Sequence, residues 1–170
     1  MQQPEEREVP AGAITAALDI VEALHGRDSG LPPSQVVDQM MRSLKIWGRP
    51  AVTEAFGTII YVAAQRLQPA PDDPDSTGLK MRIVASVVTK LQQNLPEVRT
   101  EHLPTVAGLL TAAFLEIGPY EWRTAFGPVE PGEDLAWCYT AWLMVDFVDT
   151  TTEHPGGFAE VLRAVLGADT

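Results

Sequence analysis

The sequence is poor in cysteine, in basic side chains and in long apolar runs. Its 170 residues include one cysteine, Cys138, which excludes an intramolecular disulfide framework and a cysteine-based zinc cluster. No apolar run reaches the roughly 18 residues that a membrane-spanning helix needs, and no basic-then-apolar signal opens the chain. Twelve Lys and Arg residues stand against 23 Asp and Glu residues, and this net charge of -11 argues against a molecule that seeks phosphate backbones with its whole surface. We therefore expect a cytoplasmic protein.

The chain also lacks the usual signatures of catalysis. It contains no glycine-rich phosphate loop, no His-Glu-x-x-His motif and no nucleophile elbow. The three histidines, His25, His102 and His154, fall at expected helix ends or in loops and share no functional spacing. Cys138 lies in an apolar stretch, where a buried and inert thiol is expected. The sequence thus predicts no metal, no cofactor and no catalytic residue, and it favours a non-catalytic role.

Fourteen prolines divide the chain into segments whose apolar residues have helical spacing. Proline interrupts a helix because it removes a hydrogen-bond donor and clashes with the preceding turn. No segment alternates apolar and polar residues as a half-buried strand would. Helices are expected at residues 10–25, 34–47, 51–67, 79–95, 104–117, 133–149 and 157–166, with a short turn or helix at Tyr120 to Phe126. The sequence therefore predicts an all-α bundle of six or seven helices.

These helices are expected to form a single domain, 10–167, after a flexible acidic tail at 1–9. A loop rich in proline and aspartate is expected at 69–78. The residues expected on the inner face of the second helix are Val37, Met40, Met41, Leu44 and Trp47. Those expected to pack the fourth helix are Met81, Val84, Val88, Leu91 and Leu95, whose spacings of three and four form a heptad-like seam.

Charge is distributed unevenly along the chain. Residues 101–170 hold eleven acidic residues but only two basic ones, whereas residues 31–70 hold two acidic and four basic ones. Arg42, Lys45 and Arg49 follow one another at helical spacing and form a basic stripe, which we interpret as a contact for an acidic surface on this chain or on another one. The tight junction that follows allows an alternative, a DNA-binding regulator that uses the two helices within residues 34–66. Against it, the second of these helices offers Glu54 and few cations, whereas base readout needs Arg, Lys, Asn or Gln.

The most unusual segment is the helix expected at 133–149, which is apolar on nearly all sides. One face carries Trp137, and the other carries Tyr139, Trp142, Asp146 and Asp149. Such a helix is either central in its own bundle or covered by a partner.

The second face allows a different function. Two carboxylates one turn apart beside aromatic rings could hold an organic amine or another cation, or could supply acid–base chemistry. The alternative is that Asp146 and Asp149 form the solvent edge of the helix, or accept hydrogen bonds from the segment Thr150-Thr151-Thr152 that follows.

We therefore expect a non-catalytic helical protein that contacts other protein chains, including a second copy of itself in a homodimer. The residues expected at such interfaces are Trp137, Trp142, Arg42, Lys45 and Arg49. The first alternative is a domain or enzyme for a small molecule, which would bind at Tyr139, Trp142, Asp146 and Asp149. The second alternative is the DNA-binding regulator.

Overall fold

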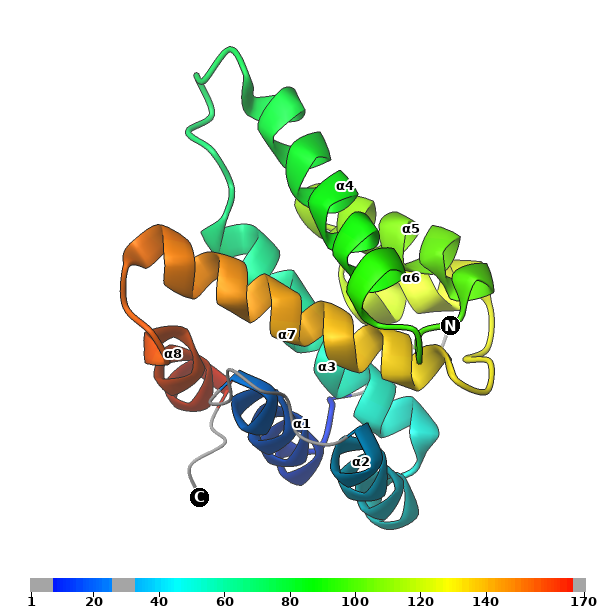
Figure 1. The fold of residues 1–170 in the computed structure, drawn as a ribbon. Coiled ribbons are helices and arrows are strands. Elements are labelled where there is room, and N and C mark those ends of the chain that lie inside the picture. Colours follow the sequence, from blue (N-terminus) through cyan, green and yellow to red (C-terminus); the bar gives the residue numbers. More distant parts are fainter. Residues whose placement is uncertain (1–7, 26–32, 167–170) are drawn as a thin grey trace, which may run out of the picture.

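The computed structural model describes residues 8–25 and 33–166, and over these residues the chain forms eight α-helices, one 3-10 helix and no strand (Figure 1). The all-α prediction is therefore confirmed. The elements are α1 (Ala11–His25), α2 (Pro33–Trp47), α3 (Arg49–Arg66), α4 (Ser76–Asn94), η1 (Thr100–His102), α5 (Leu103–Phe114), α6 (Pro119–Phe126), α7 (Glu133–Thr152) and α8 (Gly157–Leu166). The helix additional to the seven expected ones is α6. Most of the tail expected at 1–9 lies outside the described residues.

The centre of the bundle is the pair of helices α3 and α7. Helices α1 and α8 pack against this pair on one side, and α4 and α5 pack on the other (Figure 1). Helix α3 buries Phe56, Ile59 and Ile60 completely. It also contains Gly57, where an added Cβ would lie 2.7 Å from Pro119 of α6 and 2.7 Å from the ring of Trp137 in α7. A glycine at this position therefore lets both helices approach the α3 backbone closely.

Side-chain hydrogen bonds and ion pairs join the outer helices of the bundle to their neighbours. Gln65 of α3 and Gln68, two residues beyond the end of α3, donate hydrogen bonds of 2.8 Å to the carbonyl oxygens of Ala113 and Phe114 at the end of α5. The carbonyl oxygens in the last turn of a helix have no N–H donors within that helix, so these two side chains supply donors. Arg163 joins α8 to α1 through ion pairs with Asp19 at 2.7 Å and Glu22 at 2.8 Å. These carboxylates raise the pKa of Arg163 above its usual value.

The inner face expected for α2 is partly wrong, although Met40 is buried and Leu44 packs against the core as expected. Val36, Met40 and Ser43 are buried, whereas Val37 is 37% exposed and Met41 is 54% exposed. Apolar residues occur as neighbours along this helix, so two overlapping stripes are available, and packing on α1 and α3 selects the one through Val36.

The seam expected for α4 is also partly wrong, and the loop before this helix is shorter than expected. The buried residues are Ile83, Val84, Val87 and Leu91, and Met81 is 54% exposed. Helix α4 begins at Ser76, so the last three residues of the loop expected at 69–78 are helical. None of the described helices is long and apolar enough to cross a membrane.

Candidate functional site

The four residues expected to hold a ligand lie along α7, but one of them has a structural role. Tyr139 is 3% exposed, and its ring meets that of Trp142 edge-on at 6.4 Å between centroids. Asp149 is 4% exposed, and its two carboxylate oxygens accept hydrogen bonds of 3.0 Å from the backbone N–H groups of Gly156 and Phe158. The Asp149 side chain therefore caps the start of α8. Asp146 is half-buried beside these residues.

Burial is the main electrostatic influence on this part of α7. It raises the pKa of Tyr139 to about 12, with a contribution from the negative charge of Glu97. Burial also raises the pKa of the Cys138 thiol far above its usual value. A thiol that stays protonated and enclosed is a poor nucleophile, so Cys138 is a packing residue.

Helix α7 is covered by its own chain. Trp137 is 1% exposed, and α7 packs against α1, α3, α4, α5 and α8. Trp137 therefore presents almost no surface to a partner, and the expectation that it contacts a second copy is corrected. Trp142 is half-buried and keeps part of its ring at the surface. The apolar faces of α7 suggested a dimer because such faces need a partner to cover them. Neighbouring helices of the same chain pack against them instead.

The expected basic stripe is divided between two places. Arg42 and Lys45 are exposed on α2, whereas Arg49 begins α3 and places its Nε 3.4 Å from Oδ2 of Asp134 in α7. Helix α3 packs against α1, α5, α6 and α7, which leaves little of its surface free to enter a DNA groove. This packing argues against the DNA-binding alternative.

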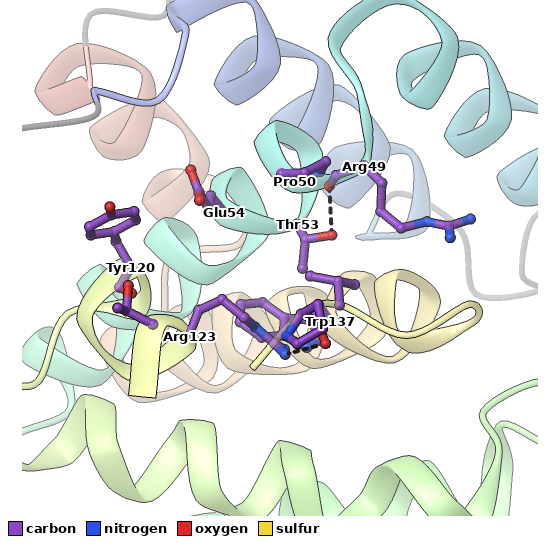
Figure 2. A pocket seen from close by; sticks show the side chains of 10 residues that line it. Arg49, Pro50, Thr53, Glu54, Tyr120, Arg123 and Trp137 are labelled. Carbon is purple, nitrogen blue, oxygen red and sulfur yellow. Dashed lines mark hydrogen bonds between the residues drawn. The ribbon is translucent and has the colours of Figure 1, made fainter. Parts of the chain in front are cut away.

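A cavity of about 390 Å³ lies between the first two turns of α3, helix α6 and the loop 127–132 (Figure 2). In Figure 2, Glu54 and Tyr120 lie at one end and Arg49 lies at the other. Its lining residues are Arg49, Pro50, Thr53, Glu54, Tyr120, Arg123, Thr124, Pro128, Val129 and Trp137. None of the four residues expected to hold a ligand lines it.

A buried ion pair supports the wall of this cavity. The Arg123 guanidinium pairs with Glu133, which is 2% exposed, and also donates to the carbonyl oxygens of Gly127 and Pro128. Glu133 also accepts a 3.1 Å hydrogen bond from the indole N–H of Trp137. Together these bonds hold the loop 127–132 against the start of α7.

Aromatic rings surround the Arg123 guanidinium. Its central carbon lies 5.0 Å from the ring centre of Trp137, 5.2 Å from that of Trp122 and 5.8 Å from that of Phe126. Desolvation by these neighbours lowers the pKa of Arg123, and the charge of Glu130 opposes that shift. Because Arg123 carries its charge in such a setting, Glu133 is needed to compensate it.

Two hydroxyl groups that line the cavity form hydrogen bonds within their own helices. Thr53 donates to the carbonyl oxygen of Arg49 at 2.8 Å, and Thr124 donates to that of Tyr120 at 2.9 Å. Across the described part of the chain, no group of three or more His, Cys, Asp or Glu side chains is placed to hold a metal ion.

A second cavity, of about 550 Å³, lies between the start of α1 and the end of α8. It is bordered by Glu8 and Leu166, where the described residues end, and Glu8 is its one charged lining residue. The first cavity has the richer chemistry of the two.

Sequence reasoning missed Arg123, Glu133 and Tyr120 as site residues. One signal was present, because Arg123 is one of only two basic residues in 101–170 and lies between Trp122 and Phe126. Its partner Glu133 follows a loop whose path no local pattern specifies.

Comparison with known proteins finds no matching family model, no similar curated protein and no similar solved structure. The function is therefore argued from the geometry of the chain.

Proposed function

We propose that this chain is a non-catalytic helical protein that binds another protein through the outward face of α2. The observation that carries the proposal is the exposure of large apolar side chains on that face. Met41 is 54% exposed and Ile46 is 70% exposed, and Val37 adds further apolar surface. At 100° per residue, Val37 and Met41 lie on one flank of α2 and Ile46 lies on the other, with exposed Arg42 and Lys45 between them. Exposed apolar side chains bordered by charged groups are typical of interaction sites.

The charges beside these residues indicate the character of the partner surface. Arg42 and Lys45 are exposed on the same helix, with Asp38 as the nearby acid, although the whole chain carries a net charge of -11. A complementary surface is therefore apolar and acidic, because like charges across an interface are strongly unfavourable. An acidic amphipathic helix has both properties.

The position of α2 in the bundle makes this face accessible. Helix α2 packs chiefly against α1 and α3, and Trp47 at its end lies over Gly12 of α1. Its inner residues Val36 and Met40 are satisfied by these contacts, so the outer apolar residues contribute nothing comparable to the fold. Their exposure supports a role in binding.

Site-specific photocrosslinking tests the proposal. A benzoylphenylalanine residue replaces Met41 in the chain expressed in the cells that encode it, and the matched control replaces Met81 of α4, which is also 54% exposed. We expect a discrete adduct at position 41 and none of the same mass at position 81. The adduct mass then distinguishes a second copy of this chain from a different protein.

Reversing the basic charges supplies the second arm of this experiment. The double substitution Arg42→Glu and Lys45→Glu should reduce the adduct at position 41 by about tenfold or more, because it places like charges across the interface. Equal labelling at positions 41 and 81, or an adduct unaffected by charge reversal, would contradict the proposal.

A further inference from the structure

The cavity between α3, α6 and the loop 127–132 has the size and lining of a small-molecule site. Its volume of about 390 Å³ lies within the range of roughly 300–1,000 Å³ that such sites occupy. Pro50, Tyr120, Pro128, Val129 and the edge of Trp137 supply mostly apolar walls. Rings and prolines favour a flat apolar body, which stacks on them with little loss of side-chain entropy.

Two arginine side chains, Arg49 and Arg123, belong to the lining. Each guanidinium has five N–H donors. Three of those on Arg123 are used by Gly127, Pro128 and Glu133, and its Nε has no hydrogen-bond partner among the described residues. Among the described residues, Arg49 forms one ion pair, in which its Nε lies 3.4 Å from Asp134, and this Nε makes no hydrogen bond. The two cationic guanidinium groups at the lining favour a ligand that carries a hydrogen-bond acceptor, such as a carboxylate.

The two ends of the cavity differ in charge. Arg49 lies in the first turn of α3, whose N-cap is Gly48 with no capping side chain, so the positive end of the helix dipole adds to the guanidinium charge. Glu54 lies at the opposite end with Tyr120 (Figure 2). A negative group is thus attracted toward Arg49 and repelled from Glu54.

We propose that this cavity binds a small aromatic carboxylate. The carboxylate lies at the Arg49 end, where a guanidinium can bind it with two parallel hydrogen bonds. The ring lies between Pro50, Tyr120 and the Arg123 side chain, which Glu133 and three aromatic rings keep in place. This site uses none of the exposed α2 residues Val37, Met41, Arg42, Lys45 and Ile46, so it is independent of the protein-binding surface.

Two probes with the same ring and opposite charge test the assignment. 3-Phenylpropionate and phenethylamine are titrated into the ¹⁵N-labelled full chain, and the indole N–H of Trp137 and the Nε–H of Arg123 are followed by NMR. We expect 3-phenylpropionate to shift both signals and to bind at least about tenfold more tightly than phenethylamine. Equal affinities, or tighter binding of the amine, would overturn the proposal.

Amino-acid substitutions test whether 3-phenylpropionate binds in the cavity. Arg49→Gln should weaken 3-phenylpropionate by about tenfold or more, whereas Lys45→Gln, which removes the same charge from α2, should leave its affinity unchanged. Thr124→Trp introduces a large ring from an exposed lining position and should abolish binding while the remaining amide spectrum stays native. Binding that survives in Thr124→Trp would show that the probe lies elsewhere and would refute the site. None of these outcomes depends on crosslinking at Met41, so the two proposals fail separately.

Discussion

Helices α7 and α2 both carry large apolar side chains on more than one face, and the bundle treats them in opposite ways. On α7, Trp137 and Met144 are at most 1% exposed. On α2, Met41 and Ile46 are more than half exposed. The difference lies in the neighbours, because five helices pack against α7 whereas α2 packs chiefly against α1 and α3.

Apolar content therefore does not decide which helix carries a docking surface. A helix that is apolar all round is stable when it lies at the centre, as α7 does. The same excess of apolar side chains at the edge of the bundle leaves surface for a partner. We therefore propose an interface on α2 rather than on α7, where the sequence favoured it.

The largest expected effect comes from removing the central ring of α7. Trp137→Ala should lower the free energy of unfolding by about 3–5 kcal/mol, because it leaves a cavity beside Gly57 and removes a hydrogen bond from buried Glu133. Urea denaturation followed by far-UV circular dichroism measures this loss. The matched control on α2 is Trp47→Ala, which should cost about 1–2 kcal/mol because that ring is 39% exposed. Equal losses would mean that the two helices do not differ as described.

The next effect concerns the carboxylate that caps α8. Asp149→Ala should cost about 2–3 kcal/mol, because two backbone N–H groups lose a charged acceptor. Hydrogen exchange of the Gly156 and Phe158 amides should accelerate in the same variant. Asp149→Asn, which keeps one acceptor oxygen, should lose less stability and serves as the control. Unchanged exchange at both amides would show that Asp149 does not act as a cap.

Trp142 tests whether the exposed edge of α7 also binds a partner. Trp142→Ala should lower the free energy of unfolding by about 1–2 kcal/mol, because the ring is half-buried against Tyr139. Sedimentation should give the same mass for the variant and the wild type. A halved mass in the variant would return the dimer interface to α7 and would weaken the assignment to α2.

The positions of the helices could be predicted from local signals, and the faces could not. Prolines such as Pro50 and Pro104, together with glycines, mark helix ends, and the seven expected helices agree with the structure within three residues at each end. The side of α2 that is buried depends on where α1 and α3 lie. Because Val36 and Val37 are both apolar, the sequence permits either choice.

The candidate cavity was beyond sequence reasoning for the same physical reason. Its walls combine Arg49 at the start of α3, Tyr120 in α6 and Trp137 in α7. Only the packing of three separate helices brings these residues together. Tyr120 and Trp137 both lie within residues 114–158, which hold nine of the twelve aromatic residues of the chain, so composition alone marks this part as unusual.

The smallest expected effect on stability separates two adjacent methionines of α2. Met41→Gln should change the free energy of unfolding by less than about 0.5 kcal/mol, because the side chain is already 54% exposed. Met40→Gln is the matched control. It buries an amide at a position that is 3% exposed, and it should cost about 2–3 kcal/mol.

The same pair of variants connects stability to binding. Met41→Gln keeps the fold but replaces apolar surface at the centre of the proposed docking face, so it should weaken the crosslink formed by a benzoylphenylalanine placed at the neighbouring Val37. A loss of stability comparable to that of Met40→Gln would show that Met41 is covered by its own chain. In that case the apolar excess of α2 would be structural, as it is on α7, and the difference between the two helices would no longer indicate a partner.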